Sequence, residues 1–215
     1  MPKKIGIIGS GVVGQSLASG FLRSGHKVMI GTREKEKLAD WLKGAGKNAS
    51  VGSDSEAAAF GEILVLCTKW QGAQNAINLA GKKNFSGKVL IDITNPLLFE
   101  NEGQAPALAL GYPDSAGATV QRWLPEAKVV KCFNTISASM MANPKMEEGT
   151  ADMFMAGNDD GAKKTVYDLA AEWGWSPIDL GGIEQSYLLE AIAMAWIVYG
   201  FRNNHWTHGF RLLGK

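Results

Sequence analysis

Cysteine is scarce in this sequence, with two residues among 215. Cys67 and Cys132 both lie in apolar runs typical of interior strands, so the sequence predicts reduced thiols and argues against a disulfide framework. Cys67 has no histidine near it in the sequence, which makes a nucleophilic role improbable. The three histidines show no metal-ligand spacing, and no metal site is expected.

The chain also lacks an excess of charge of either sign, because 22 basic residues face 21 acidic ones. No basic footprint for nucleic acid or for an anionic membrane is expected, and a small molecule is the favoured partner. The longest apolar stretch, 187–201, is interrupted by Glu190 and Gly200 and falls short of the roughly 20 residues that a membrane span needs. The first residues lack a signal-peptide pattern, so a cytoplasmic location is expected.

Short apolar strands alternate with stretches of helical spacing along most of the chain. The runs at 4–8, 28–30, 63–67, 89–93 and 129–133 are rich in Val and Ile, as parallel strands covered on both faces are. This alternation predicts an α/β fold, a doubly wound and mostly parallel sheet of Rossmann type. Residues 1–150 are expected to form the Rossmann domain, and residues 151–215 a small C-terminal α/β extension with a closing helix.

A glycine pattern follows the first strand directly. Residues 9–14 read G-x-G-x-x-G and open a stretch with helical spacing, which is the context of a dinucleotide-binding fingerprint. Gly9 would make the tight turn, Gly11 would let the backbone approach a pyrophosphate, and Gly14 would let the helix pack on the strand. The alternative is an ordinary glycine-rich turn.

The end of the second strand indicates which dinucleotide is bound. NAD-selective domains carry Asp or Glu there, whereas this chain carries Thr32 and Arg33. A hydroxyl and a guanidinium suit the 2′-phosphate of NADP(H), and Lys37 could add a second cation one helical turn later. The alternative is that Arg33 and Lys37 form the solvated basic start of a helix.

Two more strand ends are expected at the same edge of the sheet. Thr68, Lys69 and Trp70 follow the run at 63–67, and Thr94 with Asn95 follows the run at 89–93. Ligands of open α/β sheets lie outside the carboxyl ends of the strands, so these residues should contact the nicotinamide half of the cofactor. Trp70 could equally be a core aromatic.

The sequence resembles the NADP oxidoreductases that use the deazaflavin coenzyme F-420 (F420), together with the related NADPH domains of membrane ferric reductases. The resemblance covers nearly the whole chain and rests on segments 9–14, 32–37, 68–70, 131–136 and 156–160. It implies hydride exchange between NADPH and a planar acceptor, F420 or a flavin, with the protein supplying orientation instead of acid-base groups. No catalytic residue is therefore assigned.

The resemblance also implies an acceptor site near residue 134. Asn134, Thr135 and Ile136 are the predicted substrate-binding residues, and Ala138 would border the nicotinamide. Archaeal members tend to carry His where Asn134 stands, so the segment 133–138 is closer to the ferric-reductase branch. The predicted cofactor-binding residues are Gly9, Ser10, Gly11, Val12, Val13, Gly14, Thr32, Arg33, Lys37, Thr68, Lys69, Trp70, Thr94, Asn95 and Ala138.

Two other functions stay open at this point. One is an NADPH-dependent flavin or ferric reductase, and the other is a non-catalytic NADP(H)-binding sensor. The loop from Pro96 to Pro113 has room to act as a lid over a second ligand, which favours an enzyme.

The helix expected at 183–202 is apolar around nearly its whole circumference. Its own domain can bury one face. The other face would form an exposed apolar patch of the kind that marks a protein interface, so a two-fold homodimer is expected.

Overall fold

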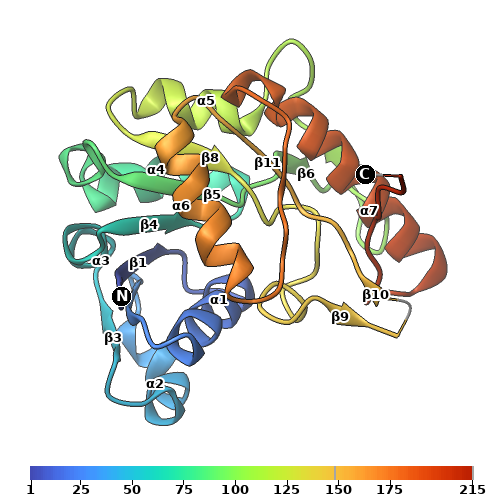
Figure 1. The fold of residues 1–215 in the computed structure, drawn as a ribbon. Coiled ribbons are helices and arrows are strands. Elements are labelled where there is room, and N and C mark those ends of the chain that lie inside the picture. The colour runs from blue at the N-terminus through green and yellow to red at the C-terminus, as the bar shows by residue number, and fades with distance from the viewer. Residues whose placement is uncertain (148, 215) are drawn as a thin grey trace.

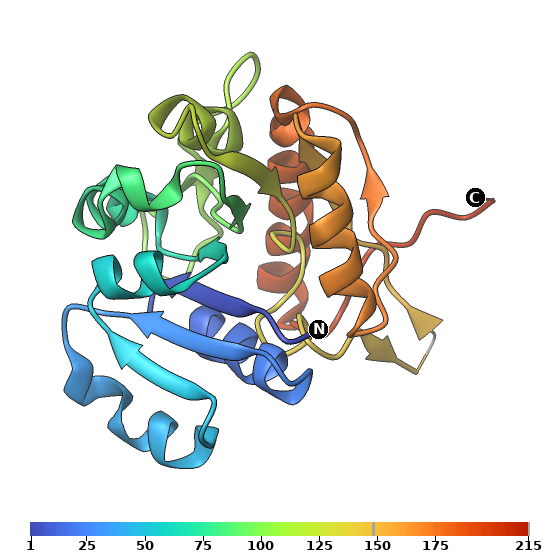
Figure 2. The same cartoon turned by 60° about the vertical axis from the view of Figure 1, so that its left-hand side comes forward.

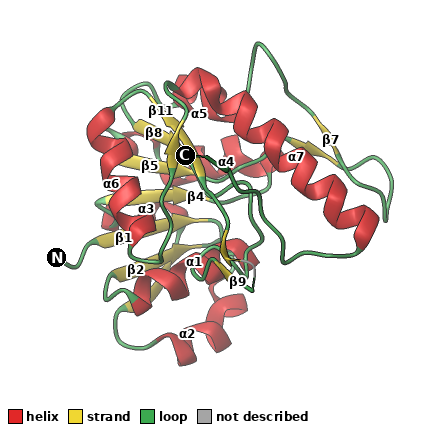
Figure 3. Ribbon diagram, turned by 45° about the vertical axis from the view of Figure 1, so that its right-hand side comes forward, coloured by secondary structure: helices red, strands yellow, loops and turns green. Residues whose placement is uncertain are grey.

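The sheet has the strand order of a doubly wound nucleotide-binding domain. The computed structural model describes residues 1–147 and 149–214, and these include an eight-stranded sheet in the order β12-β11-β8-β5-β4-β1-β2-β3 (Figures 1 and 3). The strands from β3 to β8 in this order are parallel neighbours, with β1 in the middle. This confirms the predicted fold class, and it places the topological switch point beside β1.

The parallel strands lie where the apolar runs predict them, with one exception. The sequence did not indicate β3, because this edge strand is only partly buried and contains a single β-branched apolar residue, Val51. The strands of the sheet are β1 (Lys4–Ile8), β2 (Lys27–Gly31), β3 (Ala49–Gly52), β4 (Ile63–Leu66), β5 (Val89–Asp92), β8 (Lys128–Lys131), β11 (Phe154–Gly157) and β12 (Ile178–Asp179).

The C-terminal strands continue the same sheet. β11 runs antiparallel to β8, and β12 runs parallel to β11. Two small hairpins lie outside the sheet: β6 (Leu97–Leu98) pairs with β7 (Ala107–Leu108), and β9 (Lys145–Met146) pairs with β10 (Gly149–Thr150). The expected loop from Pro96 to Pro113 therefore contains the β6–β7 hairpin.

Several of the helices begin at residues whose side chains cap them. Ser53 Oγ accepts a hydrogen bond from Glu56 N at 3.1 Å, and Asp159 Oδ1 accepts one from Ala162 N at 2.7 Å. Within the described residues, no helix is long and apolar enough to cross a membrane. The helices are α1 (Val12–Arg23), α2 (Ala39–Ala45), α3 (Asp54–Phe60), α4 (Trp70–Ala80), α5 (Ala116–Trp123), α6 (Asp160–Ala171) and α7 (Ser186–Asn203), with short 3-10 turns η1 (Lys35–Leu38), η2 (Lys82–Phe85) and η3 (Ile183–Gln185).

Helices cover both faces of the sheet, as Figure 2 shows. Along β4, Val65 belongs to the core that includes α1 and α6, whereas Leu64 and Leu66 belong to the core that includes α3, α4 and α5. Successive side chains of a strand point to opposite faces, so a strand covered on both sides is apolar throughout. This burial explains the uninterrupted apolar runs in the sequence.

α7 and the β6–β7 hairpin stand beyond the carboxyl ends of the parallel strands (Figure 3). Asn134, just after β8, donates a hydrogen bond from Nδ2 to the carbonyl oxygen of Leu189 at 3.1 Å. Gln71, at the start of α4, donates one from Nε2 to the carbonyl oxygen of Leu97 at 2.9 Å. These two elements therefore form walls around the edge of the sheet where ligands are expected.

Candidate active site

A cleft of about 730 Å³ follows the carboxyl edge of the sheet from β2 to α4. Its floor is the glycine turn between β1 and α1, and its far wall is the exposed side of α4. This wall includes Asn75 and Leu79 of α4, which were not among the predicted site residues. The predicted cofactor residues that line it are Gly9, Ser10, Gly11, Val12, Val13, Thr32, Arg33, Lys37, Thr68 and Lys69.

The three fingerprint glycines differ in what a side chain would meet. Gly9 has φ +126°, a conformation that favours glycine, and a Cβ on Gly14 would collide with the carbonyl oxygen of Gly9. Around Gly11, by contrast, a Cβ would meet nothing within 4 Å. Gly11 is also the N-cap of α1 and provides no side-chain cap, so the first N–H groups of the helix are available to an anion. The free space and the free donors fit a pyrophosphate.

Arg33 is the uncommitted cation at the end of β2. It is exposed at the cleft and makes no hydrogen bond or ion pair with any residue that the structure describes. Thr32 is buried, and its hydroxyl accepts a hydrogen bond from Ser10 Oγ at 3.1 Å. Lys37 forms an ion pair with Glu34 at 2.9 Å. The hydrogen bond and the charge of Lys37 hold the pKa of the Glu34 carboxyl below its usual value. Arg33 is therefore the better candidate for a 2′-phosphate.

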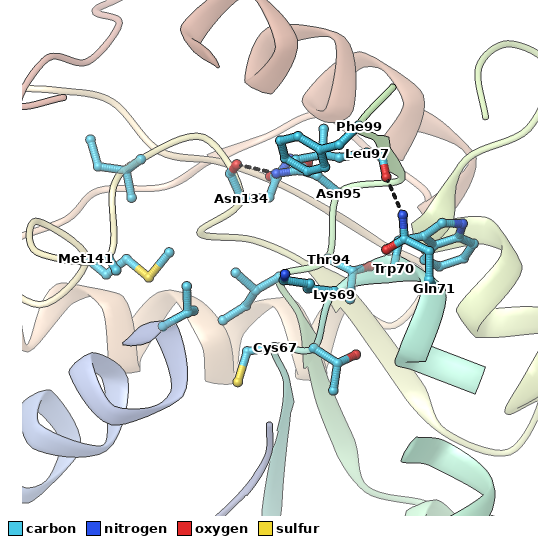
Figure 4. Close-up of a pocket in the computed structure, with 15 residues that line it drawn as sticks. Cys67, Lys69, Trp70, Gln71, Thr94, Asn95, Leu97, Phe99, Asn134 and Met141 are labelled. Carbon is cyan, nitrogen blue, oxygen red and sulfur yellow. Dashed lines mark hydrogen bonds between the residues drawn. The ribbon is translucent and has the colours of Figure 1, made fainter. Parts of the chain in front are cut away.

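A second cavity of about 240 Å³ adjoins the cleft (Figure 4). Val13, Cys67, Thr68 and Lys69 line both, so the two spaces lie side by side. The predicted residues around this second cavity are Trp70, Thr94, Asn95, Asn134, Ile136 and Ala138, and the structure adds Gln71, Ile93, Leu97, Phe99 and Met141. The sequence could not indicate Leu97 and Phe99 individually, because the hairpin and not a local motif brings them there.

Two asparagines lock the rim of the second cavity. Asn134 Nδ2 donates to Asn95 Oδ1 at 2.9 Å, and Asn95 Nδ2 donates back to the carbonyl oxygen of Asn134 at 2.9 Å (Figure 4). Since Asn134 Nδ2 also bonds the carbonyl oxygen of Leu189, the ends of β5 and β8 and helix α7 are held together. Residues from three distant parts of the chain thus share one rigid polar rim.

Below this rim lies a fully buried cluster of charged side chains, Asp92, Lys131 and Glu190, that the sequence did not predict. Lys131 Nζ lies 2.9 Å from Asp92 Oδ2 and 3.0 Å from Glu190 Oε1, and it also donates to the carbonyl oxygen of Thr94. Burial alone would lower the pKa of Lys131, but the two carboxylates raise it above its usual value. The sequence could have indicated this group, because Asp92 and Lys131 stand at the ends of apolar strands and charges are almost never fully buried unless they are paired.

Glu190 ties the charges to a helix end. It accepts hydrogen bonds from the backbone N–H groups of Ala116 at 3.0 Å and Gly117 at 3.1 Å, in the first turn of α5. Asp92 Oδ1 accepts from both N and Oγ1 of Thr94. The network therefore fixes the backbone at Thr94, which lines the second cavity.

Two predicted site residues, Thr135 and Trp70, and the cysteine Cys67 have environments that refine their roles. The hydroxyl of Thr135 faces Met153 Sδ at 3.9 Å and the residue is buried, so Thr135 lies behind the wall of the second cavity and does not line it. Trp70 lines the cavity and also stacks on Trp123 with ring centres 5.3 Å apart, so both interpretations of Trp70 apply. Burial raises the pKa of the Cys67 thiol to about 12, so the thiol stays protonated.

In the described part of the chain, no group of three or more His, Cys, Asp or Glu side chains is placed to hold a metal ion. The fold, with the cleft and the cavity at the carboxyl edge of the sheet, defines an NADP-dependent oxidoreductase of Rossmann type.

Comparison with known proteins then gives the family. Residues 4–96 match the family model described as "NADP oxidoreductase coenzyme F420-dependent". The chain is 33% identical over 204 residues to the F420-dependent NADP reductase of Methanocaldococcus jannaschii, and the match covers 88% of each protein. It is 30% identical over 223 residues to that of Methanothermobacter thermautotrophicus, covering 99% and 95%. The chain belongs to the F420-dependent NADP oxidoreductase family.

Other similarities extend the relationship. The chain is 29% identical over 192 residues to the metalloreductase STEAP3 of Rattus norvegicus, and it spans only 36% of that protein's length. A solved protein of Arthrobacter sp. FB24 superposes with a TM-score of 0.91 at 35% identity, covering 98% of this chain and 99% of the other. A reductive aminase of Aspergillus terreus, at 19% identity and a TM-score of 0.69, shares the fold; 95% of this chain and 64% of that one are covered.

Proposed function

We propose that this protein transfers a hydride between NADPH and a planar ring acceptor, F420 or a flavin. The second cavity carries the proposal. It adjoins the cofactor cleft at Thr68 and Lys69, at the carboxyl edge of the sheet where the nicotinamide half of a Rossmann cofactor lies. A cofactor-binding sensor would need space there for the nicotinamide ring alone, and no further aromatic surface for an acceptor.

The lining of this cavity suits hydride transfer better than acid-base catalysis. Its titratable side chains are the protonated Cys67 thiol and Lys69, and no His, Asp or Glu among the residues that the structure describes lines it. Trp70 and Phe99 provide aromatic surface for a flat ring, while Thr94, Asn95 and Asn134 provide polar groups at one side. NADPH itself supplies the hydride from its nicotinamide ring, and solvent supplies the proton that the acceptor ring also takes up, so the protein has chiefly to hold the two rings in place.

The cofactor's position follows from the same residues. The α1 N-terminus and Gly11 would receive the pyrophosphate, Arg33 and Thr32 the 2′-phosphate, and Thr68 and Thr94 the nicotinamide side. Asn134 and Ile136, held by the asparagine rim and by α7, would border the acceptor ring. We place this activity in the cytoplasm.

Assaying NADPH oxidation with F420, FMN and a ferric chelate tests the proposal. We expect F420 or FMN to be reduced directly, and the ferric chelate to be reduced only when a flavin is also present. Reduction of the chelate alone would favour a ferric reductase. NADPH binding without turnover of any acceptor would favour the sensor.

Arg33 is expected to set the preference for NADPH over NADH. A charge-assisted hydrogen bond to the 2′-phosphate is worth roughly 1.5 to 3 kcal/mol, so Arg33→Ala should weaken NADPH binding about 10- to 100-fold and leave NADH binding unchanged. Lys37→Ala is the matched control and should have a smaller effect, because Glu34 already pairs with Lys37. Equal weakening of both cofactors in calorimetric titrations would show that Arg33 does not contact the phosphate.

We also propose that α7 forms the centre of a two-fold homodimer. Leu188, Ala191, Ala195 and Val198 are exposed at helical spacing along one side of α7, while the other side is buried in its own chain. An apolar stripe of this kind is typical of an interface. Light scattering should give about twice the monomer mass of 23.1 kDa, and Val198→Glu should give the monomer. A wild-type monomer at high concentration would refute the dimer.

A further inference from the structure

The floor of the cofactor cleft contains a carboxylate without a partner. Asp54 is 8% exposed and lines the cleft, yet its carboxylate makes no hydrogen bond and no ion pair with any described residue. Burial raises its pKa, and Arg33 opposes this only from beyond ion-pair distance. The carboxylate oxygens reach the cleft, so water or a bound ligand can donate hydrogen bonds to them there.

The surroundings of Asp54 leave it open to the adenosine side of the cleft. Asp54 is the first residue of α3, directly after the capping residue Ser53. It packs against Gly31, where a Cβ would lie 2.7 Å from Asp54 Oδ1 and 2.8 Å from its Cα. Gly31 immediately precedes Thr32 and Arg33, so the carboxylate lies next to the residues proposed to receive the 2′-phosphate.

An ionised carboxylate only accepts hydrogen bonds, so its partner must be a donor. The anionic 2′-phosphate, which has no hydrogen to donate, is therefore excluded as the partner of Asp54. NAD-binding Rossmann domains take such a carboxylate from the end of the second strand and use it to bind ribose hydroxyls. Here that position is occupied by Thr32 and Arg33, and Asp54 brings a carboxylate into the same region from the following strand-helix junction.

We propose that Asp54 is a cofactor-binding residue that accepts a hydrogen bond from a neutral donor of the adenosine moiety, either a ribose hydroxyl or the adenine amino group. The proposal rests on the binding of NADP(H) in this cleft, which the proposed function requires, and not on the identity of the acceptor. Arg33 and Asp54 then divide the adenosine end between them, one for the phosphate and one for a neutral donor.

Calorimetric titration of NADPH into Asp54→Ala and Asp54→Asn proteins tests this. A hydrogen bond to a charged group predicts that Asp54→Ala binds NADPH about tenfold or more weakly. Asp54→Asn keeps an acceptor oxygen and should lose much less. Asp40→Ala is the charge-matched control, because Asp40 lies on α2 with a 96% exposed side chain and should leave the affinity unchanged.

A second ligand separates the two donors. NADPH with hypoxanthine in place of adenine lacks the amino group; if it binds wild type tenfold more weakly and loses nothing further in Asp54→Ala, the amino group is the donor. If it binds wild type as NADPH does and loses affinity in Asp54→Ala, the donor is a ribose hydroxyl. If Asp54→Ala unfolds, Asp54→Ser takes its place. Serine is favoured at the start of a helix, and its side chain is too short to accept the hydrogen bond that Asp54 accepts from the ligand.

Unchanged or tighter binding of NADPH by folded Asp54→Ala or Asp54→Ser would overturn the proposal, the tighter result meaning that the carboxylate repels the 2′-phosphate. These titrations contain no acceptor. If the Asp54 variants bind NADPH more weakly than wild type as expected, but wild type reduces no acceptor, the proposed function is refuted and this inference stands.

Discussion

Gly11→Val is expected to abolish NADPH binding while leaving the chain folded. Gly11 has φ −73° and ψ −173°, an extended conformation that valine adopts readily, and a Cβ there meets nothing within 4 Å. The protein therefore has no need of glycine at this position. The ligand does, because a branched side chain at the N-terminus of α1 would occupy the path by which the pyrophosphate approaches the backbone.

Two matched variants make this result specific. Gly14→Val should unfold or strongly destabilise the domain, since its Cβ would collide with the Gly9 carbonyl oxygen. Gly44→Val, on α2, also adds its side chain to open space but outside the cleft, and should change neither folding nor binding. Thermal melts and NADPH fluorescence titrations report both properties. NADPH affinity retained in Gly11→Val would mean that the pyrophosphate does not lie on this turn.

Lys131→Met should cost about 3 to 5 kcal/mol of the free energy of unfolding, because it leaves two buried carboxylates without their cation. Asp92 and Lys131 are 0% exposed and Glu190 is 1% exposed, so water cannot replace the missing charge. For a chain of this size the loss corresponds to a melting temperature lower by about 10 °C. Acceptor KM should rise as well, since Lys131 also holds the backbone of Thr94 at the second cavity.

The control is Lys164→Met on the surface of α6. Lys164 pairs with Asp168 at 2.9 Å, but the two side chains are 74% and 59% exposed, and such pairs contribute about 0 to 1 kcal/mol. Denaturant titrations of the two variants should therefore differ several-fold in the free energy lost. A loss for Lys131→Met as small as that for Lys164→Met would show that the buried charges are not coupled.

The features that the sequence predicts well are those encoded by neighbouring residues. The glycine turn and the position of Arg33 after β2 each depend on a few consecutive residues and on one strand-turn-helix unit. The five buried parallel strands were evident because burial on both faces makes a strand apolar along its length. The edge strand β3 lacks that burial, and it was missed.

Features that depend on distant parts of the chain could not be placed in advance. The buried charges join Asp92, Lys131 and Glu190 from two strands and the closing helix, and Asp54 reaches the cleft only because Gly31 lets β2 pack closely on it. Thr135 shows the same limit in reverse. Its neighbours in sequence, Asn134 and Ile136, line the cavity, but its own side chain turns to Met153.

The most direct test of the proposed function is to follow deuterium from the nicotinamide C4 of NADPH into reduced F420. Two NADPH samples, each deuterated at one of the two C4 positions, would be oxidised with F420 by the purified protein, and the products analysed by mass spectrometry. Because the two rings are held in one orientation, deuterium from one sample should appear on the ring carbon of reduced F420, and deuterium from the other should remain in NADP. Protein that binds NADPH but gives no reduced F420 or flavin, or reduced F420 without deuterium from either sample, would contradict direct hydride transfer.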